Sequence, residues 1–356
     1  MTESESKKSP YAVGAQRGHV SNRVPPVVAI VLNWNNLPDT LECVSSLRRS
    51  DWSNLSVWVV DNDSLEDPTA ALHESHPGVR VIRNPRNEGY GSGNNSGLRH
   101  AIQEGAEYAL LLNNDVVVAP DTVRYLVEVA EADLRIAMAT PRVVHYDRPA
   151  EVYWDGGVIN WDTGDPRKRS ATLPLQGGVR RSEWLDGCAL LVRISALRDV
   201  GFLDERYFLY FEDVDWSLRA RSRGWMNAVV LRAEAWHKVS RSTGGLANPA
   251  VRYYYARNRY LFLKTHSPVG MRRLWRLRYA RRMLSEYRLL PADSQDREAI
   301  AAAGISLLRG RWGRYEVSVA SRVVVGVLDS IEKVLRSLKR CCRSIKNLAR
   351  TIAQQR

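Results

Sequence analysis

The sequence predicts an α/β fold in which a mixed, mainly parallel sheet is flanked by helices. Short apolar runs rich in β-branched residues alternate along the chain with segments of helical spacing, which is the pattern of repeated βαβ units. Polar clusters follow several of these runs, where parallel sheets gather their functional groups. The 356 residues are 44% hydrophobic and 26% charged, so the chain can bury a sizeable core.

The elements are expected in the following order. The run VVAIVL is apolar throughout, which is typical of a strand buried on both faces. Further strands are expected at 56–60, 79–83, 108–112, 136–139 and 229–232, and helices at 39–49, 67–75, 121–132 and 249–266. The glycine-rich segment 87–97 opens another helix, and the acids near residue 212 begin one more. Residues 140–182, rich in Gly, Pro and Asp, are expected to form an irregular insertion over the rim of the sheet.

Charge divides the chain into three predicted parts. Residues 1–24 are polar and expected to be disordered, residues 25–266 form the α/β domain, and residues 267–356 form a basic helical region. The last part holds 20 Lys and Arg against 7 Asp and Glu, whereas the remainder is balanced at 32 of each. No apolar window is long enough to span a bilayer, and the four cysteines lack zinc spacing, which favours a reducing cytoplasm.

The basic region carries an amphipathic pattern. From residue 331 to 352 apolar side chains recur at helical spacing opposite a face of Lys and Arg, as in helices that lie on anionic membranes. Residues 271–290 add arginines with Trp275 and Tyr279, residue types that suit the lipid headgroup zone. We expect a peripheral position on the inner face of the cell membrane. A helix packed on the body with a solvated basic face is an alternative, and nucleic acid binding is not expected.

Polar side chains lie where four predicted strands end, so we expect them on one rim that suits a nucleotide-bearing substrate. They are Asn33, Asp61, the loop from Asn87 to Asn94, and Asn113-Asn114-Asp115. Asp61 could accept hydrogen bonds from a base or ribose, or cap a turn. The glycines at 89–93 let the backbone approach a ligand, or form a tight turn.

Two acidic sites suggest group transfer from a diphosphate. Asp115 with its flanking amides offers oxygen ligands for Mg²⁺ or Mn²⁺ bridging a diphosphate, and Glu212-Asp213 offers a separate base. His237 follows the last predicted strand and could be a further metal ligand, although a lone histidine is more often structural.

Seven segments together resemble the inverting family 2 glycosyltransferases of the GT-A fold, in the branch of bacterial rhamnosyltransferase-like enzymes. These segments are VVAIVLNWNN, VVDNDS, NEGYGSGNNSGLRHA, LLNNDV, WLDGCALLVR, GFLDERYFLYFEDVDWSLRAR and AWHKVS. They occur in the order and spacing of the family between residues 26 and 266.

The resemblance implies a role for each matching residue. Asp61 corresponds to the base-binding acid, and Asn87, Gly89 and Asn94 to the nucleotide-binding loop. Asn113, Asn114 and Asp115 lie at the Asp-x-Asp metal motif, with His237 as a metal-coordinating histidine. Trp184, Asp186 and Gly187 match the acceptor-side segment, and Asp213, beside Glu212, matches the catalytic base. Asn113 departs from the family acid, which leaves Asp115 as the single carboxylate of the motif.

The resulting prediction is a glycosyltransferase that uses Mg²⁺ or Mn²⁺ and moves a sugar from a nucleotide-diphosphate donor to a hydroxyl with inversion. L-Rhamnose from a dTDP donor and a glycan or polyprenyl-linked acceptor follow from the branch. A UDP donor carrying a hexosyl, N-acetylglucosaminyl or galactofuranosyl group is the alternative. Two other classes, a nucleotidyltransferase and a non-catalytic carbohydrate-binding module, stay open on the residues alone.

Overall fold

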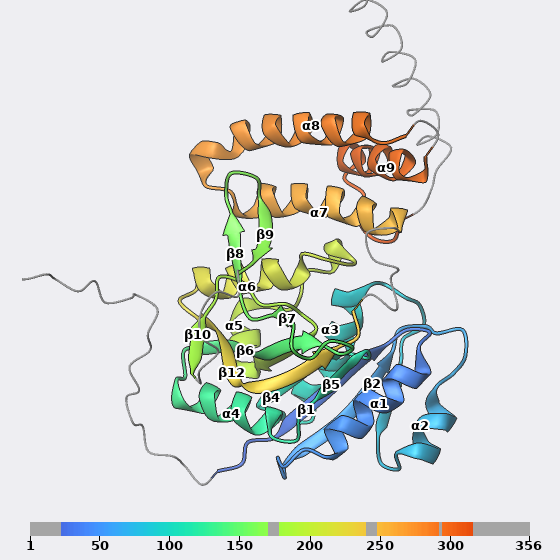
Figure 1. Ribbon diagram of the computed structural model, residues 1–356, viewed down its shortest axis with the longest axis vertical. Coiled ribbons are helices and arrows are strands. Elements are labelled where there is room, and N and C mark those ends of the chain that lie inside the picture. The colour runs from blue at the N-terminus through green and yellow to red at the C-terminus, as the bar shows by residue number, and fades with distance from the viewer. Residues whose placement is uncertain (1–22, 170–177, 240–247, 292–293, 316–356) are drawn as a thin grey trace, which may run out of the picture.

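The computed structural model describes residues 23–169, 178–239, 248–291 and 294–315, which form an α/β layer beneath three stacked helices (Figure 1). The segment 1–22 and the predicted amphipathic stretch 331–352 lie outside the described residues.

A ten-stranded mixed sheet forms the centre of the molecule, in the order β10-β12-β6-β11-β4-β1-β2-β3, with β5 paired to β12 and β7 to β6. Its strands are β1 (Val27–Asn33), β2 (Leu55–Asp61), β3 (Arg80–Arg83), β4 (Tyr108–Asn113), β5 (Val116–Val118), β6 (Ile136–His145), β7 (Val152–Trp154), β10 (Val179–Arg181), β11 (Ala189–Arg193) and β12 (Met226–His237). The predicted mixed, mainly parallel sheet with flanking helices is confirmed.

The parallel strands bring the predicted polar residues to one edge. In register, Asn33 of β1 lies beside Asp61 of β2, and Leu32 lies beside Asn113 of β4. The strand β11 lies between β4 and β6 and is antiparallel to both. The sheet therefore continues from β4 through β11 to β6. Because parallel strands end at the same edge, side chains far apart in sequence meet there.

The helices are α1 (Leu37–Arg48), α2 (Thr69–Ser75), α3 (Tyr90–Gln103), α4 (Thr122–Ala132), α5 (Ile194–Val200), α6 (Glu212–Ser222), α7 (Pro249–His266), α8 (Arg272–Leu289) and α9 (Gln295–Arg309). The start of α1 is capped by Asn36, whose side chain accepts a hydrogen bond from the Asp39 amide, with a proline in the first turn. Helix α3 packs closely on β1 and β2 because Gly97 presents no side chain to Ile30 and Val60.

The insertion expected to be irregular contains strands in its described part. Strand β6 continues to His145 because it pairs with the long strand β12. A hairpin of β8 (Gly157–Asn160) and β9 (Asp165–Lys168) then rises toward α7 (Figure 1). Trp161 of this hairpin stacks on Phe262 of α7 with ring centroids 6.1 Å apart.

Helices α7, α8 and α9 form a layer of their own, and contacts cross the position of the domain boundary predicted at residue 266. Tyr253 and Tyr254 of α7 share a buried cluster with Tyr287 of α8 and the alanines of α9. Trp275 and Tyr279, the aromatic residues expected at lipid headgroups, are instead buried on the inner side of α8. Among the described helices, none is both long and apolar enough to cross a membrane.

We expect Gly97→Ala to lower the free energy of unfolding by about 1–3 kcal/mol, because the new Cβ overpacks the α3–sheet interface. That Cβ would lie 2.7 Å from Ile30 Cγ2 and 3.0 Å from Val60 Cγ2. The matched helical control is Gly304→Ala in α9, whose nearest neighbour is Met283 Cε at 3.8 Å, and it should be neutral or stabilising. Urea unfolding measures both, and equal stabilities would contradict the packing argument.

Candidate active site

A cavity of about 540 Å³ opens at the edge of the sheet where the parallel strands end. Its walls come from the strand ends, the loop before α3, the segment before β11, the loop before α6, and helix α7. The predicted site residues that line it are Asn87, Gly89, Asn113, Asn114, Asp115, Trp184, Asp186, Gly187, Glu212, Asp213 and His237. The fold therefore brings residues separated by 150 positions into one cavity.

Three predicted site residues lie beneath the cavity rather than in its wall. Asn33, Asp61 and Asn94 are each at most 1% exposed. Asn33 Nδ2 donates to Asp61 Oδ1 (2.8 Å), and the backbone amide of Ser64 donates to Asp61 Oδ2 (3.2 Å). The Asp61 carboxylate also meets Arg83 Nε at 3.4 Å. Its acceptors are thus occupied by protein donors that tie the ends of β1 and β2 together.

The side chain that the second strand presents to the cavity is Asn62, which the sequence analysis did not single out. Asn62 Nδ2 donates to Asn87 Oδ1 (3.0 Å) and to the carbonyl of Gly89 (3.1 Å). This pair joins the end of β2 to the glycine-rich loop. The only sequence signal for Asn62 is its place beside Asp61 in VVDNDS, since alternate residues after a strand can face opposite sides.

The glycine-rich loop makes a close approach to another loop. Gly89 has φ +96°, and a Cβ there would lie 2.1 Å from the carbonyl oxygen of Phe208. The amide of Tyr90 donates to the same oxygen at 2.6 Å. Gly89 is therefore required for the contact between the strand-end side of the cavity and the loop that precedes α6.

Asp115 and His237 face each other in the wall. Asp115 follows β4, His237 ends β12, and the pairing of β5 with β12 brings them together. His237 Nε2 lies 3.2 Å from Asp115 Oδ1, and both side chains are almost completely buried. Within the described chain no group of three or more His, Cys, Asp or Glu is arranged to hold a metal.

The pair is nevertheless suited to a divalent cation that takes its other ligands from a substrate. Adjacent ligands of an octahedral ion with bonds of about 2.1 Å lie about 3 Å apart, which the oxygen–nitrogen separation approximates. His237 Nδ1 is buried with no hydrogen-bond partner among the described residues. The Nδ2 group of Asn114, which also lines the cavity, donates to Thr40 Oγ1 (3.0 Å) beneath the site.

Glu212 and Asp213 begin α6 and face the same cavity. Asp213 Oδ2 accepts a hydrogen bond from the amide of Gly187 (2.9 Å), which fixes the carboxylate against the segment before β11. Burial, together with the nearby charge of Asp186, raises the pKa of Asp213 to about 7. Burial and the charge of Asp213 raise the pKa of Glu212 well above its usual range. A carboxylate with a pKa near neutrality is suited to general-base work.

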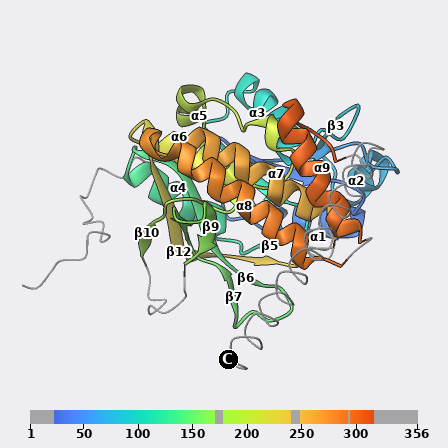
Figure 2. The same ribbon diagram turned by 90° about the horizontal axis from the view of Figure 1, so that it is seen from above.

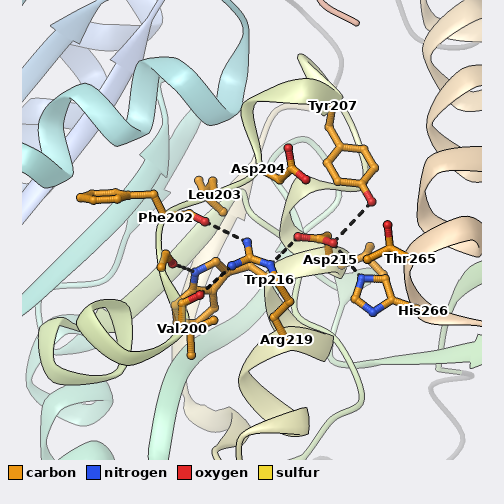
Figure 3. Close-up of polar contacts among 12 residues, drawn as sticks. Val200, Phe202, Leu203, Asp204, Tyr207, Asp215, Trp216, Arg219, Thr265 and His266 are labelled. Carbon is orange, nitrogen blue, oxygen red and sulfur yellow. Dashed lines mark hydrogen bonds and ion pairs between the residues drawn. The ribbon is translucent and has the colours of Figure 1, made fainter. Parts of the chain in front are cut away.

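The third acid of this motif, Asp215, has a structural position. It is not among the residues that line the cavity, and its carboxylate lies between Arg219 and His266 (Figure 3). Asp215 Oδ2 accepts from Arg219 Nε and its Oδ1 contacts His266 Nε2, each at 2.7 Å. Although burial acts to raise its pKa, these partners hold the pKa of Asp215 below its usual range. Asp215 therefore anchors α6 to the end of α7.

The loop before α6 has an unfavourable backbone. Phe208, Tyr210 and Phe211 have φ of 64°, 68° and 78°, a left-handed conformation that costs about 1–3 kcal/mol for each residue other than glycine. All three line the cavity, and Phe211 is the residue before Glu212. The position of the acidic pair thus depends on whatever holds this loop.

Helix α7 holds it through two fully buried polar residues. Asn258 Nδ2 lies within hydrogen-bond distance of three carbonyls, those of Tyr207, Leu209 and Tyr210, at 2.7–2.9 Å. Arg257 Nη2 donates to the carbonyls of Arg206 (3.0 Å) and Tyr207 (2.5 Å). Its Nη1 donates to Gly313 beyond α9 at 2.6 Å. We call this arrangement of Arg257 and Asn258 the α7 clamp.

The family comparison decides the class of this cavity. Residues 28–179 match glycosyl transferase family 2. N-acetylglucosaminyl-diphospho-decaprenol L-rhamnosyltransferase of Mycobacterium tuberculosis is 30% identical over 243 residues, which are 62% of this chain and 78% of that protein. The chain belongs to glycosyl transferase family 2. It is a nucleotide-sugar glycosyltransferase, and the nucleotidyltransferase and binding-module alternatives lose their support.

A further curated relative supports the same family, and two solved structures share the fold. A dTDP-rhamnosyl transferase of Shigella flexneri is 23% identical and aligns over 68% of this chain and 82% of its own length. The mannosyltransferase of Pyrobaculum calidifontis, solved with GDP-Man and Mn²⁺, shares the fold with a TM-score of 0.51 and 15% identity, over 91% of this chain and 84% of that one. GalNAc-T7, solved with UDP, GalNAc and Mn²⁺, has a TM-score of 0.52 with 15% identity, and the alignment covers 74% of this chain and 55% of that one.

We expect Asn258→Ala to reduce kcat at least tenfold while the donor KM changes less than threefold, because the loop that carries the acidic pair loses its clamp. The variant also leaves buried carbonyls unpaired, a loss of about 1–3 kcal/mol of stability. Thr122→Ala is the control, since it removes the buried hydrogen bond from Thr122 Oγ1 to the Glu234 carbonyl outside the cavity wall. Steady-state kinetics well below both melting temperatures should separate the two, and equal kcat values would contradict the positioning role.

Proposed function

We propose that the enzyme transfers L-rhamnose from a dTDP donor to a hydroxyl of a polyprenyl-diphosphate-linked glycan, with inversion and with Asp213 as general base. The rhamnosyl donor is supported by the Mycobacterium and Shigella relatives, which are rhamnosyltransferases, and the lipid-linked acceptor by the Mycobacterium enzyme. The observation that carries the reaction is the shared cavity: Asp213, with its pKa of about 7, and the Asp115–His237 pair line the same 540 Å³ space.

In this reaction Asp213 removes the proton of the acceptor hydroxyl as its oxygen forms a bond to the anomeric carbon. The bond from that carbon to the diphosphate breaks with its electron pair, so a single displacement inverts the anomeric centre. The amide of Gly187 holds one oxygen of Asp213, which keeps the base oriented toward the acceptor side. Trp184 and Asp186 lie on that same side of the cavity and would contact the acceptor.

Asp115 and His237 are the residues that would hold Mg²⁺ or Mn²⁺ together with the donor diphosphate. When bound, the cation offsets the negative charge that grows on the leaving diphosphate. The 3.2 Å separation of Asp115 Oδ1 and His237 Nε2, both from residues in the cavity wall, supports this assignment. Asn113 can contribute an amide oxygen at most, so the ion would depend on the diphosphate for most of its ligands.

The donor nucleotide would lie between Asn62, Asn87 and Trp34 on the strand-end side of the cavity. The resemblance assigns Asp61 to binding of the nucleotide base. Here it would contribute indirectly, by fixing the turn that carries Asn62. A UDP donor with another sugar is the competing proposal. A thermal-shift screen of nucleoside diphosphates and their sugars with Mn²⁺ separates the two, because the correct nucleotide binds only the folded enzyme.

We expect Asp213→Asn to reduce transfer by about 10²–10⁴-fold without weakening donor binding, because the amide cannot accept the hydroxyl proton. In the unchanged enzyme kcat/KM should rise with pH up to about 7 and then level off, since the base must be ionised. Asp121→Asn, at the exposed start of α4, is the matched control. Substantial activity in Asp213→Asn would remove this residue from the mechanism.

A second variant tests the cation site. In the unchanged enzyme Mn²⁺ should raise the donor affinity at least tenfold. Asp115→Ala should abolish this increase and leave the metal-free affinity unchanged within a factor of three. Isothermal calorimetry with and without Mn²⁺ measures both quantities, and Asp121→Ala serves as the control. A donor affinity that still responds to Mn²⁺ in Asp115→Ala would show that the ion is bound elsewhere.

A further inference from the structure

Helix α8 is the outermost element of the helical layer, on the side of α7 away from the sheet (Figures 1 and 2). Its inner side is fixed to the body: Trp275, Tyr279 and Tyr287 are buried, and the Tyr279 hydroxyl donates to the carbonyl of Ala256 in α7. The orientation of α8 about its own axis is therefore set by these contacts, and so is the set of side chains that it turns outward.

The side chains turned outward form a continuous ridge. They follow one another at spacings of three and four residues, which places them on one face of the helix. The ridge, which we call the α8 outer face, consists of Leu274, Leu277, Arg281, Leu284 and Arg288. Leu277 is 64% exposed, and Leu274 and Leu284 are 42% and 41% exposed. Exposed leucines in a row between arginines are unusual on a surface that contacts only water.

The positive charge around this face is not neutralised. Helix α8 contains seven arginines and one acid, Glu286. Arg282 turns inward to Asp165 (2.7 Å) and to Glu286. The outward arginines have no carboxylate within ion-pair distance among the described residues; they are Arg276, Arg278, Arg281 and Arg288.

We propose that the α8 outer face is a docking surface for an anionic lipid bilayer. This inference rests on the proposed function, in which the acceptor is lipid-linked. A helix that presents leucines toward acyl chains and arginines toward headgroup phosphates lies in the plane of the membrane interface. Within this helix the residues of the α8 outer face would therefore contact the lipid, whereas Trp275 and Tyr279, which were expected to do so, are buried.

Two other occupants fit the face less well. Residues 316–356 carry nine basic and three acidic residues, so this segment of the chain is repelled by an arginine surface. A nucleic acid would bind the arginines through its phosphates, but the leucines offer bases neither stacking nor hydrogen bonds. A bilayer with anionic headgroups above apolar acyl chains complements both the arginines and the leucines of the α8 outer face.

The placement of α8 also suits an acceptor held in the same membrane. Helix α7 lies between the α8 outer face and the cavity, and its own Val251, Tyr254 and Tyr255 line the cavity wall. Because the docked face is on the far side of α8, the thickness of two packed helices, α8 and α7, or roughly 20 Å, separates it from the cavity wall. The sugar of a membrane-embedded polyprenyl diphosphate would therefore extend about this far from the docked surface to reach Asp213.

The test uses the full-length enzyme and sedimentation with vesicles of phosphatidylglycerol and phosphatidylcholine that contain no acceptor. We expect the double variant Leu277→Ser with Leu284→Ser to lower the partition coefficient at least tenfold. The matched control is Leu65→Ser with Leu134→Ser, two leucines that are 92% and 66% exposed on the α/β layer. The control should bind as the unchanged enzyme does, within twofold.

A second pair tests the charge. Arg281→Glu with Arg288→Glu should weaken binding to these vesicles by more than tenfold, whereas Arg48→Glu with Arg49→Glu, at the exposed end of α1, should change it less than threefold. Vesicles of phosphatidylcholine alone should bind all variants weakly. Thermal unfolding of each variant confirms that the comparison is made on folded protein.

Unchanged vesicle binding by the leucine pair would overturn the proposal, since binding would then come from residues 316–356 or another surface. An equal loss in the leucine control would overturn it as well. A parallel measurement with single-stranded RNA gives a third outcome. If the enzyme binds RNA more tightly than vesicles, and the leucine substitutions leave RNA binding unchanged, the face is a site for a polyanion and the proposal is overturned. Transfer to a polyprenyl-linked acceptor is assayed separately in detergent, so a failure of the proposed acceptor leaves the vesicle result intact, and the reverse also holds.

Discussion

The structure depends on one constraint, the left-handed backbone of Phe208, Tyr210 and Phe211 in the loop 208–211, which helix α7 holds in place. This loop contacts Gly89 on the strand-end side, precedes Glu212 and Asp213, and lines the cavity between them. Its conformation is unfavourable by itself, so it persists because Asn258 donates to the carbonyls of Leu209 and Tyr210 and Arg257 holds the carbonyl of Tyr207 just before the loop. Helix α7 is consequently part of what positions Glu212 and Asp213 and not an appendage to the α/β layer.

The charges and hydrogen-bond donors around each carboxylate, and not its burial alone, separate the roles of the aspartates. Asp61 is enclosed by donors and braces the sheet edge, and Asp215 is enclosed by Arg219 and His266 and braces α6. Asp213 has two amide donors, and among the described residues no cation lies within ion-pair distance of it, so burial raises its pKa toward neutrality. An aspartate can thus brace the structure or be suited to act as a base, as proposed for Asp213, according to the charge and hydrogen bonds around it.

The family resemblance predicted some of the residues around the cavity and gave no indication of others. The motif residues Asp115, Asp213 and His237 meet in one cavity because strand ends and helix starts share the edge of a parallel sheet. Asn258 and Tyr255 reach the cavity or its loop from helix α7, and Arg314 lines the cavity from the segment that follows α9. No local pattern marks such residues, because their role arises only when α7 packs against the loop before α6.

The sequence by itself determined the fold class, the order of most elements and the family, because apolar periodicity and the spacing of short motifs are local properties of the chain. Tertiary structure alone decided that Asn62 rather than Asp61 faces the cavity, that β6 continues through the expected irregular insertion, and that Trp275 and Tyr279 turn inward. The physical reason is that each of these outcomes depends on which face of an element is buried, and burial is set by partners distant in the chain.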